Sequence, residues 1–257
     1  LPEVDVTLGE LRLRSGQPAE AVSAFQRALS LRPNDYEALL GLARAQDASG
    51  DVANAERMYG RAIQLQPSYW FGYSKFAGFY FNRGQYAPAA EMFRRVTELA
   101  PDSARAFSNL GATYHQMDRL EDALTAYRKS LGIEHTSMAY SNLGTTEFFL
   151  GQYAEASRDF EKAVALTPER YDGWADLADA CYWSGQRGRA RVAYERAIHL
   201  ARSDLQINAR NPSARARLAV CLARTEDRAG AREQIGQALA LSQQDPACSM
   251  MPRSWRA

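Results

Sequence analysis

Cysteine is scarce in this chain, and its placement excludes two common kinds of small-domain scaffold. Only three cysteines occur among 257 residues, and no two of them form a C-x-x-C pair. This argues against a disulfide framework and against a structural zinc site. Cys181 and Cys221 lie in apolar helical stretches and are predicted to be buried free thiols. Cys248 lies in a polar tail and is predicted to be exposed.

Catalytic motifs are also missing. The three histidines, His115, His135 and His199, are far apart in the sequence, and the chain has no G-x-S-x-G, H-E-x-x-H, P-loop or G-x-G-x-x-G motif. Carboxylates are plentiful, but most stand beside Arg or Lys at positions expected to be solvated helix faces. We therefore predict that the chain is not an enzyme and has no catalytic residues, no metal site and no cofactor.

The chain has neither a strong net charge nor a long apolar run. A formal net charge of +1 gives no global attraction to nucleic acid or to an anionic membrane. No apolar run approaches the roughly 18 residues needed to span a bilayer. Nucleic-acid partners and membrane insertion are therefore not expected. The chain begins at Leu1 rather than Met, which indicates a piece of a longer protein and leaves the compartment open, with a slight preference for a soluble, cytoplasmic protein.

What the sequence does contain is a regular spacing. An alanine recurs every 33 or 34 residues, and an aromatic residue follows each one four positions later. A fixed period of this length is typical of stacked supersecondary units. The alanines are Ala21, Ala55, Ala89, Ala123, Ala156 and Ala190, and the aromatics are Phe25, Tyr59, Phe93, Tyr127, Phe160 and Tyr194.

Each period contains two helical patterns, as residues 70–103 illustrate. Apolar residues at positions 73, 76, 77 and 80 share one face of a first helix, and those at 86, 89, 93 and 96 share one face of a second. Gly84 provides the turn between the two helices. Small residues recur at one position of the first helix, and we expect them to let the two helices approach closely while the aromatic fills the remaining gap. These small residues are Gly9, Ala43, Ala77, Gly111, Gly144, Ala178 and Ala219.

Three stretches show the motif most clearly: "LLGLARAQDASGDVANAERMYGRAIQLQP", "AFSNLGATYHQMDRLEDALTAYRKSL" and "GWADLADACYWSGQRGRARVAYERAI". The chain resembles the tetratricopeptide repeat family over nearly its whole length. The resemblance implies an all-α, right-handed superhelical solenoid of about seven antiparallel helix pairs, with the first helix of each pair lining the concave face. The repeats are expected at 2–35, 36–69, 70–103, 104–136, 137–170, 171–211 and 212–245, so that the solenoid spans 1–245 and a tail spans 246–257.

Several repeats depart from this pattern. The fourth is one residue short, has His135 near the place where proline is expected, and has Asp118 in place of the turn glycine. The sixth is seven residues longer than the others, which predicts two extra turns, or about 10 Å, on its second helix. The seventh has Ile235 where the aromatic should be, so the apolar face of its last helix is expected to be incompletely covered.

With the helix geometry that this resemblance implies, the repeat register predicts which residues face a peptide-binding groove in repeats three to six. They are Phe71, Lys75, Phe81, Arg105, Asn109, His115, Asn142, Phe148, Phe149, Asp176, Asp179, Tyr182 and Trp183.

Three features of this set suggest how a peptide is held. Asn109 and Asn142 take the same place in the repeated "SNLG", and carboxamides at that place can pair with a peptide backbone, although each could instead bond its neighbouring helix. The aromatics supply binding area with little rotamer entropy to lose, unless they pack between layers. Asp172, Asp176 and Asp179 form an acidic stripe at i, i+4 and i+7 before an arginine-rich end, which suggests a partner of mixed charge.

The leading hypothesis is therefore a scaffold that binds a protein or peptide partner, either an extended peptide or a helix, in this groove. Two alternatives remain open. The long sixth repeat and the segment after it resemble C-terminal repeat regions of bacterial Ser/Thr protein kinases, so the chain could be the sensory or substrate-recruiting part of a larger signalling protein. The incompletely covered last helix could instead make the chain self-assemble into a homo-oligomer through its C-terminal repeat.

Overall fold

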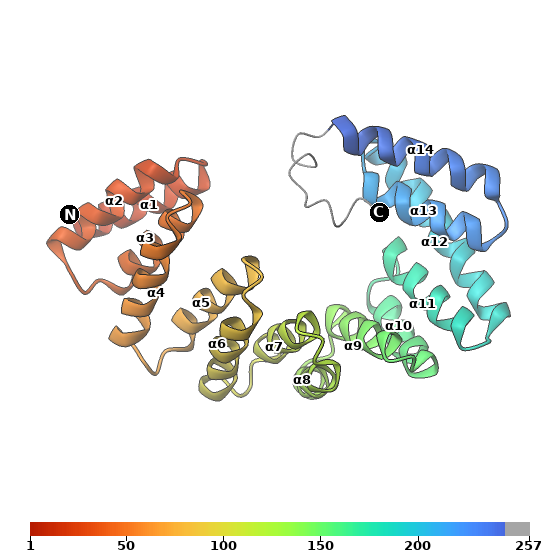
Figure 1. The fold of residues 1–257 in the computed structure, drawn as a ribbon, viewed down its shortest axis with the longest axis horizontal. Helices are drawn as coiled ribbons and strands as arrows, with labels where there is room; N and C mark the ends of the chain where they lie inside the picture. The colour runs from red at the N-terminus through yellow and green to blue at the C-terminus, as the bar shows by residue number, and fades with distance from the viewer. Residues whose placement is uncertain (245–257) are drawn as a thin grey trace. The chain divides into compact units, whose positions relative to one another are not determined.

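The computed structural model describes residues 1–244, which form fourteen α-helices and no strand (Figure 1). The all-α repeat fold predicted from the spacing is confirmed. The proposed tail and Cys248 lie outside the described residues. The helices are α1 (Pro2–Arg14), α2 (Pro18–Leu31), α3 (Tyr36–Ala48), α4 (Val52–Leu65), α5 (Trp70–Asn82), α6 (Tyr86–Leu99), α7 (Ala104–Gln116), α8 (Leu120–Ile133), α9 (Ser137–Phe149), α10 (Tyr153–Leu166), α11 (Tyr171–Trp183), α12 (Arg187–Ile207), α13 (Pro212–Arg224) and α14 (Arg228–Gln244).

The turn inside each helix pair requires one residue in the left-handed backbone region. Glycine occupies that place in five pairs, with φ between 69° and 82°, at Gly16, Gly50, Gly84, Gly151 and Gly185. Asp118 (φ 57°) and Glu226 (φ 70°) occupy it in the other two described pairs. A residue with a Cβ in this region costs about 1–2 kcal/mol, so these two turns carry strain that the glycine turns avoid.

Polar side chains cap several of the first helices. Asp35 accepts a hydrogen bond from the backbone N–H of Ala38 at 3.0 Å, and Asn211 accepts one from Ala214 at 3.0 Å. Such caps satisfy N–H groups that have no partner inside the helix. The same amide of Asn211 also donates to Asp204 at 3.0 Å, which ties the start of α13 to the end of α12.

Aromatic rings fill the space beside the small residues, as the sequence predicts. Phe25 is completely buried, and its ring lies against Gly9 in α1 and Gly41 in α3. A Cβ added at Gly9 would come within 2.6 Å of this ring, and one at Gly111 within 2.8 Å of Tyr127. The rings thus fix how closely α1, α2 and α3 approach one another.

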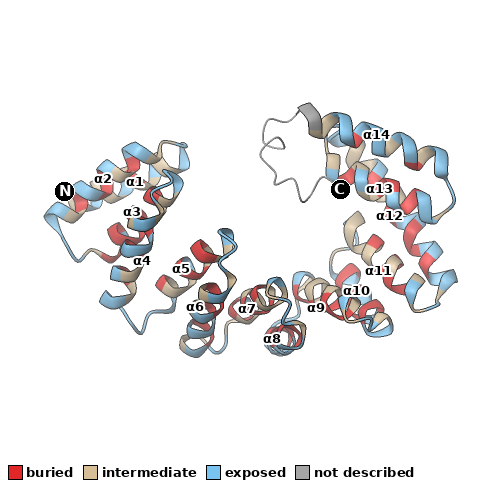
Figure 2. Cartoon of the chain, viewed as in Figure 1, coloured by how far each residue is buried: buried red, intermediate tan, exposed pale blue. Residues whose placement is uncertain are grey.

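The chain divides into two compact units. Unit 1 is Leu1–Ile133, and unit 2 begins at Glu134. The boundary falls at the shortened fourth repeat, beside His135. Each unit has its own buried core, one around Phe25 and Tyr59 and the other around Phe160 and Tyr194. Figure 2 shows the buried residues on helix faces that meet neighbouring helices.

The first helices of successive repeats form one layer within each unit. In unit 1, α3 contacts both α1 and α5, and in unit 2, α11 contacts both α9 and α13. Each second helix packs against the first helix of its own repeat and, in most cases, against the next first helix. Because the first helices lie closer together along each unit, we infer that they form its inner side.

The predicted extension of the sixth repeat is present. α12 has 21 residues, whereas α10 has 14. One face of the extension is buried against the next repeat. Ala201 is 1% exposed, and Leu205 packs with Leu218 and Leu222 of α13. The last described helix, α14, exposes 49% of Ile235 and 58% of Leu239, as expected for a final helix whose apolar face is incompletely covered.

Candidate interaction surface

In unit 1, the predicted groove residues of α5 are largely engaged with other rings. The Nζ of Lys75 lies 4.8 Å from the centre of the Phe71 ring. Phe81 is half-buried, meets Tyr86 edge-on at 5.4 Å and packs against the core of unit 1. Phe81 therefore contributes to packing as well as to the surface, and truncating it would disturb both.

The predicted residues of α7 differ in how accessible they are. Arg105 is exposed, whereas Asn109 and His115 are half-buried. Burial lowers the pKa of His115, which favours the neutral imidazole.

In Asn109 and Asn142, the asparagines of the repeated motif, the backbone oxygen is hydrogen-bonded to a described residue but the side-chain carboxamide is not. The backbone oxygen of Asn109 accepts from Thr113 Oγ1, and that of Asn142 accepts from Thr146 Oγ1, each at 2.8 Å. Neither carboxamide makes a hydrogen bond anywhere in residues 1–244, so neither bonds a neighbouring helix. Both half-buried side chains keep a donor and an acceptor available.

In unit 2, four aromatic residues make a continuous series of ring contacts, here called the aromatic row: Phe148, Tyr153, Trp183 and Tyr182. Phe148 meets Tyr153 edge-on at 5.0 Å, Tyr153 stacks on Trp183 at 6.0 Å, and Trp183 meets Tyr182 edge-on at 5.6 Å. Trp183 remains 51% exposed, and Phe149, which holds the equivalent position of the preceding repeat at the end of α9, is 68% exposed. The row therefore holds the indole ring in a defined position, while about half of the surface of Trp183 remains in water.

Two arginines lie on the end of this row. The Cζ of Arg187 is 3.5 Å from the centre of the Tyr182 ring, and that of Arg224 is 4.8 Å from the same ring and 5.8 Å from Trp183. Both distances to Tyr182 are within cation–π range. A hydrogen bond from Arg187, together with its charge, lowers the pKa of Tyr182.

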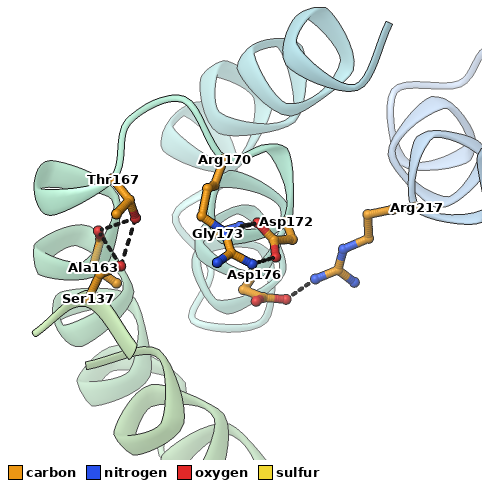
Figure 3. Close-up of polar contacts among 8 residues, drawn as sticks. All are labelled: Ser137, Ala163, Thr167, Arg170, Asp172, Gly173, Asp176 and Arg217. Atoms are coloured by element: carbon orange, nitrogen blue, oxygen red, sulfur yellow. Dashed lines mark hydrogen bonds and ion pairs between the residues drawn. The ribbon is translucent and has the colours of Figure 1, made fainter. Parts of the chain in front are cut away.

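The acidic stripe on α11 already has basic partners (Figure 3). Asp172 accepts from Arg170 Nε at 3.1 Å and from the backbone N–H of Gly173 at 3.0 Å, and Asp176 pairs with Arg217 of α13. Burial raises the pKa of Asp172, but the hydrogen bond and charge of Arg170 outweigh it, and the net effect lowers this pKa.

Asp179, the third member of the stripe, is the most enclosed. It accepts a hydrogen bond from the Tyr194 hydroxyl, and its oxygens lie 3.8 Å from Arg217 Nη1 and 4.0 Å from Arg224 Nε. Burial raises its pKa, against the opposing effects of Tyr194 and Arg224. The stripe is therefore neutralised largely by α13, and it offers little uncompensated negative charge to a partner.

Two further findings concern the part of the chain that the structure describes. No group of three or more His, Cys, Asp or Glu side chains in it is arranged to hold a metal ion. No helix in it is both long and apolar enough to cross a membrane.

Family models of the tetratricopeptide repeat match residues 12–70, 104–169 and 141–204, and a TPR-repeat model matches residues 79–118. The chain contains tetratricopeptide repeats. All four matches describe these repeats, and nothing in the comparisons supports the alternative of a link to a kinase. No match was found among curated proteins.

Solved structures with the same fold cover most of the chain. The C-terminal part of a TPR repeat-containing protein from Cytophaga hutchinsonii has a TM-score of 0.67 at 14% identity, over 95% of this chain and 98% of that one. MamA from Desulfovibrio magneticus RS-1 has a TM-score of 0.58 at 23% identity, over 65% and 95%. YrrB, described as a TPR protein with an unusual peptide-binding site, has a TM-score of 0.58 at 18% identity, over 70% and 93%. At these identities the similarity shows the fold alone.

The groove predicted from the sequence did not include four residues of this surface: Tyr153, Arg187, Arg217 and Arg224, although the three arginines belong to the arginine-rich end noted above. The repeat register contains a signal for the first two. In the third, fifth and sixth repeats, the residue three positions before the turn glycine contacts the residue two positions after it: Phe81 with Tyr86, Phe148 with Tyr153 and Tyr182 with Arg187. Arg217 and Arg224 contact residues of a different repeat, so no local signal identifies them.

Proposed function

We propose that this chain is a protein–protein interaction scaffold and that unit 2 binds an extended peptide across the inner side of α9 and α11. Tetratricopeptide repeats are typical of scaffolds that hold protein partners. The finer assignment, an extended peptide on unit 2, rests on the chemistry of that surface.

The observation that carries the proposal is the state of Trp183. The residue is 51% exposed, yet ring contacts with Tyr153 and Tyr182 hold its indole in place. A ring that is already ordered loses little side-chain entropy when a partner covers it. Large, rigid, partly exposed aromatics are therefore the residues most often found to dominate interface energetics.

Asn142 adds the polar element that an extended peptide requires. A peptide without secondary structure presents unpaired backbone N–H and C=O groups, which lose water when they bind. The unused carboxamide of Asn142 can both donate to and accept from such a backbone. Trp183 would supply apolar area, and Asn142 would align the backbone independently of the peptide's side chains.

The test is a comparison of matched tryptophan variants against a random, C-terminally amidated peptide library, followed by anisotropy measurements on individual binders. We expect Trp183→Ala to weaken binding by about 2 kcal/mol, or roughly 30-fold. The control is Trp70→Ala, because Trp70 is 39% exposed and also held by neighbouring rings, at Tyr69 and Phe71. Equal loss in both variants, or a failure of the library to yield any binder, would refute the proposal.

Self-assembly is a second candidate function, favoured by the apolar residues that α14 exposes. Ile235 and Leu239 are 49% and 58% exposed one helical turn apart, so together they offer a small apolar surface to a second copy. Sedimentation that changes with concentration, and that Ile235→Glu abolishes, would support this candidate. Concentration-independent sedimentation as a monomer would exclude it.

A further inference from the structure

The arginine side chains around Tyr182 outnumber the carboxylates that could neutralise them. Arg217 is paired with Asp176 and lies 3.8 Å from Asp179. Arg224 reaches Asp179 only at 4.0 Å, and Asp179 also accepts from the Tyr194 hydroxyl.

Arg187 has no carboxylate partner in the part of the chain that the structure describes. Its Cζ lies 3.5 Å from the centre of the Tyr182 ring. One positive charge at the end of the aromatic row is therefore uncompensated, and a second, on Arg224, is only weakly compensated.

The way these two arginines are held leaves their donors usable. Arg187 gives one hydrogen bond to the Tyr182 hydroxyl, but a guanidinium group carries five N–H donors in its plane, so most of them remain available beside the ring. Stacking also pre-organises the group, so less side-chain entropy is lost when it forms hydrogen bonds. Carboxylates match this geometry, and a charge-assisted hydrogen bond is roughly twice as strong as a neutral one.

The apolar neighbours define what else the ligand must contain. Trp183 lies 5.8 Å from the Cζ of Arg224 and is half exposed. A ligand that placed only a small anion here would leave this ring in water. A peptide with an acidic residue next to a large apolar one would cover both features at once.

We infer that Arg187 and Arg224, here called the arginine pair, bind the side-chain carboxylate of an Asp or Glu in the partner peptide while an adjacent apolar residue packs on Trp183. This inference rests on the proposed function and names the chemistry of its partner. The inference also gives the two features different roles. The Trp183 ring supplies affinity, whereas the arginine pair selects against neutral and basic peptides.

The test uses the full chain and synthetic heptapeptides that are acetylated at the N-terminus and amidated at the C-terminus. The central residue is Trp or Leu, and one neighbouring position is varied among Asp, Glu, Asn, Gln and Lys. We expect the Asp and Glu peptides to bind at least about tenfold more tightly than the Asn and Gln peptides at low salt, and Lys peptides to bind most weakly. Arg187→Gln/Arg224→Gln should abolish this preference.

The matched control is Arg196→Gln/Arg232→Gln. It also removes two positive charges from unit 2, at exposed positions that make no side-chain hydrogen bond or ion pair within residues 1–244, so it should keep the preference for acidic peptides. Arg187→Gln alone provides a second variant, because Arg187 forms no ion pair whose loss would disturb the fold. It should reduce the preference, with the circular dichroism spectrum unchanged.

Other outcomes would overturn the inference. These are equal binding of Asp and Asn peptides, an acid preference that survives in the arginine variants, or binding that requires a free C-terminal carboxylate. The proposed function has a separate readout. If the neutral peptides bind as tightly as the acidic ones, and all of them bind Trp183→Ala more weakly than the wild type, only the inference fails. If no peptide responds to Trp183→Ala, the proposed function itself fails.

Discussion

Gly41→Ala tests the idea that glycine–aromatic packing sets the spacing of the first helices. In α3, a Cβ at position 41 would collide with the fully buried ring of Phe25, which is also enclosed by Gly9. Overpacking of a filled core costs about 1–3 kcal/mol, and the upper end applies because the ring is enclosed on two sides. Replacing glycine by alanine inside a helix recovers about 1 kcal/mol. The net expectation is a loss of about 2 kcal/mol in the free energy of unfolding.

Gly78→Ala provides the matched control. Gly78 also lies inside a first helix, α5, but a Cβ there would have no atom within 4 Å. Only the helical gain applies, so this variant should be stabilised by about 1 kcal/mol. The two identical substitutions should therefore differ by about 3 kcal/mol, and in opposite directions.

Urea unfolding followed by circular dichroism measures this difference. Because repeat proteins can unfold in segments, hydrogen exchange should locate the loss of Gly41→Ala in α1–α3. Combining Gly41→Ala with Phe25→Leu should cost less than the sum of the two changes, since the smaller side chain makes room for the methyl group. If Gly41→Ala stabilises the chain as Gly78→Ala does, the packing explanation is wrong.

Three other predictions follow from the backbone and the titratable groups. Glu226→Gly should raise the free energy of unfolding by about 1 kcal/mol because it removes a Cβ at φ 70°, whereas Thr225→Gly, at φ −99°, should lower it in the same urea assay. The pKa of Tyr182 should lie below that of an ordinary tyrosine and rise in Arg187→Gln, as followed by NMR of labelled tyrosine rings; an unchanged pKa would contradict the contact. Burial raises the pKa of Cys221 to about 11 and also raises that of Cys181, so in a Cys248→Ser variant at pH 8 both thiols should react with Ellman's reagent only after unfolding, and reaction in the folded chain would contradict their burial.

Much of the repeat architecture could be predicted because it depends on local pattern. The spacing from Ala21 to Ala190 identifies the helix pairs, and the seven additional residues of the sixth repeat predict the long α12. The substitution of Asp118 for a turn glycine also proved informative, because the structure places Asp118 in the same left-handed conformation. In each case the relevant interactions lie within one repeat or between neighbours, so a short window of sequence contains them.

The sequence by itself determined the repeats, their two-helix pattern and the positions of the turns. Helix periodicity extends over a few residues and the glycine–aromatic spacing over one repeat. Within such short distances, the connectivity of the chain limits which residues can contact one another. Only the tertiary structure decided the chemistry of the candidate surface. In the sequence, Asp176 cannot be distinguished from a free surface carboxylate. In the structure it pairs with Arg217, 41 residues away on α13. Which charges remain available to a partner therefore depends on how side chains from different repeats meet.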